Sequence, residues 1–309
     1  MAKLRSNKRF QKFVKHPFEA AGLFVTLGLF RLFPVDVASN FGGWLGRMVG
    51  PRLGISRRAR RNLRLAFPDK TPLEIEKIVA GMWDNLGRVL FEYPHLDQIT
   101  AREAGRVEVV GADHVYGAAE SDRGSILAAG HLANWEVMAF VAGQHGVDLT
   151  IIVREPNNPY VQPAVDRLRG SSGGKRISKG SDGARQALQL LKRGGVLGIL
   201  FDQKMNDGIP VSFFGHTAMT PAAPAQLGLR FGCNIIPVRT ERLGAGRFRM
   251  TCYPPIEHPD SGNRKEDISS AMESLNRSLE TWIAEKPEDW LWLHRRWPQK
   301  TYDSMSPES

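Results

Sequence analysis

A histidine and a glutamate lie five residues apart in the string Gly130-His131-Leu-Ala-Asn-Trp-Glu136. The apolar segment 125–129 before this string is typical of a strand, and a helix is expected to begin near Asn134. Glu136 then lies in the first helical turn, where its carboxylate can bend back toward the imidazole of His131. An imidazole accepts a proton near neutral pH, and a neighbouring carboxylate fixes its tautomer. We predict that His131 is a general base and that Glu136 orients it.

This pair brings no nucleophile of its own, because the string contains neither serine nor cysteine. A base without a nucleophile is suited to activating a hydroxyl group of a substrate. Ligands of α/β proteins bind where strands end, which is the position that His131 takes in the sequence. An acid five residues after a histidine also occurs by chance, so a structural histidine held by hydrogen bonds is the alternative interpretation.

Short apolar segments alternate with helical segments from residue 106 onward. The predicted strands cover residues 107–110, 125–129, 149–153, 196–201, 234–238 and 248–252. The predicted helices lie near residues 111–121, 134–145, 157–170, 181–193, 220–231 and 265–285. This alternation is typical of an α/β fold with a central, mostly parallel sheet flanked by helices.

Positive charge is concentrated near the N-terminus. Residues 1–70 carry 15 Lys and Arg against 3 acidic residues, whereas the remaining chain carries 27 against 29. Such a segment attracts nucleic acid or anionic lipid. Residues 20–30 are apolar apart from Thr26, which favours lipid and argues against a nucleic-acid partner. This apolar stretch is shorter than the roughly 20 residues that span a bilayer, so we expect an interfacial or half-inserted membrane anchor.

The same stretch resembles the core of a signal peptide, but no small-x-small cleavage site precedes Arg31, so we expect it to be retained. Residues 41–50 combine apolar residues with glycines and a tryptophan, which suits close helix packing or the lipid headgroup boundary. Residues 56–67 form a basic amphipathic helix, and Thr71-Pro-Leu-Glu74 is a capping box that starts another helix. We therefore predict a helical membrane-associating region over 1–100, an α/β domain over 101–300 and a disordered tail over 301–309.

Metal and dinucleotide chemistry find no support in the sequence. Cys233 and Cys252 form no CxxC pair or Cys/His cluster, and no HExxH spacing occurs. No G-x-G-x-x-G follows any predicted strand, which excludes the common dinucleotide fingerprint. We expect a reaction that requires neither a metal nor a cofactor.

Several strings occur in the order typical of the glycerolipid acyltransferases, which share an H-x4-D/E motif. They are Arg61-Asn-Leu-Arg-Leu-Ala-Phe-Pro68, Gly130-His131 to Glu136, Val153-Arg154-Glu-Pro-Asn-Asn158-Pro159, Asp202-Gln203, Val211-Ser-Phe-Phe-Gly215 and Pro287-Glu-Asp-Trp290-Leu-Trp-Leu-His294-Arg295-Arg296. Within that superfamily the chain resembles the bacterial lipid A biosynthesis acyltransferases, the lauroyl and myristoyl transferases of lipopolysaccharide assembly. The resemblance covers roughly residues 57–297.

This resemblance implies direct acyl transfer from an acyl carrier protein thioester, or less often from acyl-CoA, to a hydroxyl of a lipid A precursor. It implies a location on the cytoplasmic face of the inner membrane, and it makes His131 and Glu136 the catalytic dyad. The same resemblance implies that four residues bind substrate: Arg154, Asn158, Asp202 and Gln203. Arg154 would contact a phosphate or the developing oxyanion, whereas Asp202 would bind the acceptor or position Arg154. A surface arginine paired with an acid, and an aspartate that caps a turn, are the alternative interpretations.

Three other functions fit the same residues. A sibling enzyme would acylate another acceptor, such as a phosphatidylinositol mannoside, an ornithine lipid or a lysophospholipid. A hydrolase would use His131 to activate water against a thioester or ester. A membrane-bound scaffold would keep the fold without catalysis.

Overall fold

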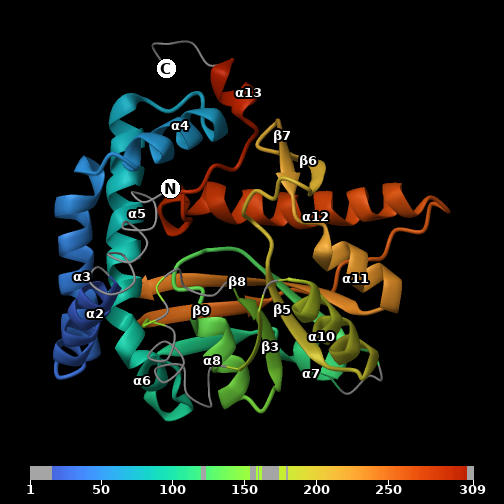
Figure 1. The fold of residues 1–309 in the computed structure, drawn as a ribbon, viewed down its shortest axis with the longest axis horizontal. Coiled ribbons are helices and arrows are strands. Elements are labelled where there is room, and N and C mark those ends of the chain that lie inside the picture. The colour runs from blue at the N-terminus through green and yellow to red at the C-terminus, as the bar shows by residue number, and fades with distance from the viewer. Residues whose placement is uncertain are drawn as a thin grey trace, which may run out of the picture.

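The centre of the molecule is a seven-stranded sheet in the order β1-β9-β8-β2-β5-β3-β4 (Figure 1). The computed structural model describes residues 16–119, 123–153, 158, 160–161, 174–178 and 180–304. The strands of this sheet are β1 (Val107–Val110), β2 (Ser125–Ala129), β3 (Leu149–Val153), β4 (Lys175–Ser178), β5 (Val196–Leu200), β8 (Asn234–Gly244) and β9 (Arg247–Cys252). Neighbours run parallel except β8 and β9, which are antiparallel. The predicted mostly parallel α/β class is confirmed.

The predicted strands are all present, and three further strands occur. The edge strand β4 has no apolar run in its sequence, because only Ile177 of this strand is buried. Strands β6 (Ile209–Phe213) and β7 (His216–Thr220) form a separate antiparallel hairpin. Only alternate residues of this hairpin are buried, and Pro210 interrupts the apolar pattern. Strand β8 continues past residue 238 because it pairs with β9 as far as Gly244.

Helices cover both faces of the sheet, which buries the central strand β2 completely. These helices are α7 (Ala112–Ala119), α8 (Val137–Gln144), α10 (Ser181–Lys192), α11 (Ala223–Phe231) and α12 (Arg264–Glu285). Leu127 and Ala129 of β2 pack in the cluster of α7 and α8, whereas Ile126 and Ala128 pack on the side of α10, α11 and α12. Strand β2 therefore lies in the core, with helices packed against both of its faces.

The N-terminal part of the described chain is helical and stands along one side of the sheet (Figure 1). It contains α2 (His16–Phe30), α3 (Val35–Val49), η2 (Gly50–Arg52), α4 (Ser56–Ala66), α5 (Pro72–Glu92), η3 (Tyr93–His95), α6 (Leu96–Thr100) and η4 (Arg102–Ala104). The capping box of α5 is confirmed, because the Thr71 hydroxyl accepts from the Glu74 N–H and the Glu74 carboxylate accepts from the Thr71 N–H.

Glycines allow α3 to lie directly against α5. A Cβ added at Gly42 would come within 2.5 Å of the Gly87 carbonyl oxygen, and one added at Gly87 within 2.1 Å of the Gly42 oxygen. Any larger residue would force the two helices apart. The close helix packing expected for 41–50 is confirmed, while Phe41 and Trp44 of the same helix remain exposed.

Helices α2 and α3 and the turn between them leave large apolar side chains exposed: Phe18, Val25, Leu29, Leu32, Phe33, Val37, Phe41, Trp44 and Met48. We call these residues the N-terminal apolar surface. Exposed large apolar side chains that gather on one surface favour an interaction with a membrane or a protein. Within the described residues, no helix combines the length and hydropathy that crossing a bilayer requires.

The C-terminal segment folds back onto the domain through η5 (Pro287–Asp289) and α13 (Gln299–Asp303). The prediction of a disordered tail from residue 301 is wrong for the start of that segment. Tyr302 is buried, and its hydroxyl donates to Asn62 Oδ1 at 2.6 Å. One aromatic residue among polar neighbours gave no periodic signal in the sequence. Residues 305–309 lie outside the described part of the chain.

Candidate active site

The site forms where two parallel neighbours, β2 and β5, end side by side. Ala129, the last residue of β2, pairs with Leu200 of β5, so both chains leave the sheet at the same edge. His131 follows β2 and Asp202 follows β5. The Asp202 carboxylate accepts from the His131 backbone N–H at 2.8 Å and lies 2.7 Å from the ring atom Nδ1. The side chain of His131 is 16% exposed and that of Asp202 is 2% exposed, so solvent reaches only the imidazole.

This contact fixes the tautomer of the histidine. An ionised carboxylate has no proton to give, so Nδ1 must carry the hydrogen and Nε2 keeps its lone pair. The side-chain nitrogen of Gln203 lies 3.2 Å from Nε2, where its amide donates to that lone pair. Nε2 of His131 is therefore the atom that can accept a proton from a bound group, once that group takes the place of the Gln203 amide.

Burial and charge oppose one another at this pair. Burial disfavours the protonated imidazole of His131, but the charge and hydrogen bond of Asp202 outweigh it and raise the histidine pKa above its ordinary value. Burial likewise disfavours the Asp202 carboxylate, yet the charge and hydrogen bonds of His131 lower the aspartate pKa to about 2. Asp202 is thus ionised at neutral pH, and its charge stabilises the protonated form of the His131 imidazole.

A tryptophan binds Oδ2 of the Asp202 carboxylate, the oxygen that also accepts from the His131 backbone N–H. The indole N–H of Trp290 donates to Asp202 Oδ2 at 2.8 Å, and Trp290 itself is buried. Trp290 also pairs with Leu132 in an isolated antiparallel bridge, and the Leu291 N–H donates to the His131 carbonyl at 3.2 Å. Sequence reasoning missed this role, for which the only available signal was an indole N–H in a buried segment that must find an acceptor.

The structure assigns the orienting contact on Nδ1 to Asp202, whereas the sequence interpretation assigned it to Glu136. Glu136 immediately precedes α8, and its backbone N–H donates to Asn134 Oδ1 at 3.3 Å. Its negative charge adds to the rise in the His131 pKa, after the larger effects of burial and of Asp202. The hydrogen bond expected from Glu136 is thus supplied by a residue 71 positions away, and a catalytic role for Glu136 stays a prediction.

Four residues are predicted to bind substrate: Arg154 and Asn158 follow β3 in the sequence, whereas Asp202 and Gln203 follow β5. Arg154 lies outside the described residues. The amide nitrogen of Asn158 donates to the His16 carbonyl at 2.8 Å and lies 3.5 Å from a carboxylate oxygen of Glu19. Asn158 therefore contacts the start of α2, and its substrate contact stays a prediction. Gln203 and Asp202 both contact His131, and their substrate contacts stay predictions.

His294 lies beside His131, with 6.3 Å between the two ring centroids. Burial lowers the pKa of His294, and the positive charge of protonated His131 lowers it further. His294 is consequently harder to protonate than His131. In the described parts of the chain, no three His, Cys, Asp or Glu side chains gather as a metal site. A metal-independent reaction stays a prediction.

A histidine oriented by a buried aspartate at the carboxyl ends of two parallel strands defines an α/β protein suited to general-base chemistry on a bound ligand. A family model described as bacterial lipid A biosynthesis acyltransferase matches residues 7–299. The chain belongs to this family of acyltransferases. The family and enzyme class predicted from the sequence are confirmed.

Its relatives act on more than one lipid by name. The chain is 25% identical to a phosphatidylinositol mannoside acyltransferase of Mycolicibacterium smegmatis, over 87% of this chain and 88% of the relative. It is 25% identical to a lipid A biosynthesis lauroyltransferase of Escherichia coli K12, over 85% and 86% of the two chains. Among solved structures, a 1-acyl-sn-glycerophosphate acyltransferase from Thermotoga maritima aligns over 81% of this chain and 96% of its own, with a TM-score of 0.39 and 14% identity.

Proposed function

We propose that this chain transfers a fatty acyl chain from the thioester of an acyl carrier protein, or of coenzyme A, to a hydroxyl group of a lipid A precursor. The observation that carries the proposal is the His131 imidazole, whose Nδ1 is held by Asp202 so that the lone pair lies on Nε2, beside the Gln203 amide. Membership of the lipid A biosynthesis acyltransferase family supports the same reaction class.

The proposed reaction is one direct displacement. Nε2 of His131 removes the proton from the acceptor hydroxyl as its oxygen attacks the thioester carbonyl carbon. The tetrahedral intermediate then expels the thiolate, which takes the proton from the imidazolium, so an ester and a free thiol result. Asp202 stabilises the transient imidazolium. The thioester supplies the activation energy, so the proposal includes neither metal nor cofactor.

Four further residues complete the proposal. The Gln203 amide, which already donates at Nε2, is placed to donate to the oxygen that reacts there. Arg154 is proposed to bind a phosphate or the oxyanion, and Asn158 to bind substrate at the junction with α2. Glu136 is proposed to add negative charge that favours the imidazolium of His131.

Two surfaces support a reaction at a membrane. The N-terminal apolar surface fits the acyl region of an inner-membrane leaflet, with the chain on the cytoplasmic face. Helix α4 exposes Arg57 and Arg61, and it is bound to the segment that carries His294, because Asn62 of the same helix donates to the Trp292 and His294 carbonyls at 2.6 and 2.7 Å. These arginines suit an acidic carrier protein or an anionic lipid, and nucleic acid is not part of the proposal.

A second acceptor class is favoured by one observation. The phosphatidylinositol mannoside acyltransferase and the lauroyltransferase named above are equally similar to this chain, at 25% identity each. The alternative proposal is therefore the same acyl transfer to a hydroxyl of another membrane lipid.

Mass spectrometry of the lipids from a cell lacking this protein tests the proposal. One secondary acyl chain is expected to be missing from lipid A, to return with the native protein and to stay missing with His131→Ala, because the proton acceptor is gone. A change confined to another lipid class would support the second acceptor. Lipid extracts that are unchanged throughout would contradict both.

A further inference from the structure

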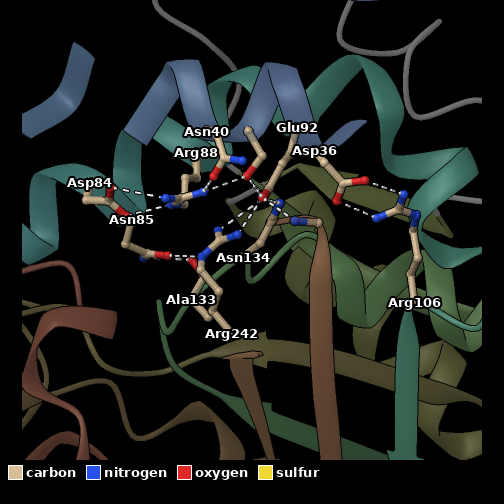
Figure 2. A network of polar contacts seen from close by, with 12 residues as sticks. Asp36, Asn40, Asp84, Asn85, Arg88, Glu92, Arg106, Ala133, Asn134 and Arg242 are labelled. Carbon is tan, nitrogen blue, oxygen red and sulfur yellow. Dashed lines mark hydrogen bonds and ion pairs between the residues drawn. The ribbon is translucent and has the colours of Figure 1, made fainter. Parts of the chain in front are cut away.

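The loop that carries His131 rests on a buried polar network, shown in Figure 2. Arg242 of β8 lies at its centre, and its Nη2 donates to Glu92 Oε2 at 3.0 Å while Nη1 donates to Glu92 Oε1. Its Nε donates to Asn85 Oδ1 at 2.9 Å. Glu92 is 0% exposed and Arg242 is 8% exposed, so the ion pair lies in the interior, between α5 and the sheet.

Both partners of Arg242 contact the loop. Glu92 Oε2 accepts from the side-chain nitrogen of Asn134 at 3.0 Å. Asn85 donates its amide hydrogen to the Ala133 carbonyl at 3.1 Å. The network thus holds two successive residues of the segment between His131 and α8, one through its side chain and one through its backbone.

The conformation that these bonds hold is an unfavourable one. Ala133 has a φ of +47°, in the left-handed region that residues with a Cβ rarely adopt. Such a conformation persists only where the surroundings determine it from several sides. Here the Ala133 N–H donates to the Asp289 carbonyl at 2.8 Å, while its own carbonyl accepts from Asn85.

We propose that Asn134 is a positioning residue, through which the buried Glu92–Arg242 pair holds the catalytic loop and so fixes His131 against Asp202. Asn134 contacts no reacting atom in this account. Its amide nitrogen is bound to Glu92 and its amide oxygen accepts from the Glu136 N–H, so one side chain fixes the loop and the start of α8. The inference rests on the proposed function of His131.

Asn134→Ala and Ser39→Ala form a matched pair that tests this inference. Ser39 of α3 donates to the other oxygen of Glu92 at 2.6 Å, so each variant removes one buried hydrogen bond to the same carboxylate. Only Asn134 belongs to the catalytic loop. With the full-length protein and an acyl carrier protein thioester, we expect kcat to fall about 100-fold in Asn134→Ala with KM within about twofold, since a misplaced catalytic group costs rate rather than affinity. Ser39→Ala is expected to keep native kcat at a similar loss of melting temperature.

If Asn134 only stabilised the fold, the two variants would lose kcat equally, or KM alone would rise. Either result would contradict the inference. A cycle with Glu92→Gln provides the second measurement. If Asn134 acts through Glu92, adding Asn134→Ala to Glu92→Gln lowers kcat little further. If the double variant instead loses kcat by the product of the two single losses, the link to Glu92 is overturned. If the native protein transfers no acyl group at all, the proposed function fails instead, so the two failures are distinguishable.

Discussion

Asp202→Asn is expected to lower kcat by about 10³- to 10⁴-fold while the protein stays folded, as loss of the orienting aspartate does in a Ser-His-Asp triad. Asp202 accepts from Nδ1 of His131 and so leaves the lone pair on Nε2. The amide of an asparagine can donate to Nδ1, which moves the ring hydrogen to Nε2 and removes the base. Steady-state kinetics with saturating donor and acceptor measure the loss.

The pH dependence of the same variant separates this cause from a general loss of structure. Because the His131 pKa is raised, the native rate is expected to fall as the pH drops through a value above 6.5, where the base becomes protonated. Without the Asp202 charge the pKa falls, so the residual activity should persist to lower pH. Asp207→Asn, an exposed change five positions away, serves as the control. Native kcat in Asp202→Asn would refute the assignment.

Glu92→Ala is expected to lower the free energy of unfolding by about 3–5 kcal/mol, since it removes one partner of a buried ion pair. The Arg242 guanidinium would remain in the interior with only Asn85 as a side-chain partner from this network. Ser39, Asn134 and the Gly246 N–H would each lose an acceptor as well. Denaturant unfolding followed by circular dichroism measures the change.

The exposed pair of Lys175 and Asp148 gives the control for that experiment. Its side chains are 71% and 69% exposed, and water screens their charges. Asp148→Ala should therefore change the free energy of unfolding by no more than about 0.5 kcal/mol. Equal losses in the two variants would show that the Glu92–Arg242 pair contributes no more than a surface contact.

Much of the fold could be predicted because its signals are local. The core strands are short apolar runs, and the capping box of α5 lies within four adjacent residues. Strand β4 and the β6–β7 hairpin escaped prediction because they bury few or alternating residues. Tyr302 escaped it because its burial depends on α4, far away in the sequence.

Individual residues of the site could be predicted from the sequence, but the contacts between them could not. His131 and Asp202 are each visible as polar residues at strand ends, but their partnership depends on β2 and β5 being neighbours in the sheet. Glu136 lies close in sequence, which made it the natural choice for the orienting carboxylate. Glu92 and Arg242 gave no signal, because a charged residue at a helix end or in a strand is usually solvated.

The central claim is that His131, oriented by Asp202, moves an acyl chain directly from a thioester to a lipid hydroxyl. The most direct test incubates purified protein with a radiolabelled acyl carrier protein thioester and vesicles that contain the lipid A precursor. The native protein is expected to move label into an ester of the lipid, and His131→Ala is expected to move none. Label released only as free fatty acid, or undiminished transfer by His131→Ala, would contradict it.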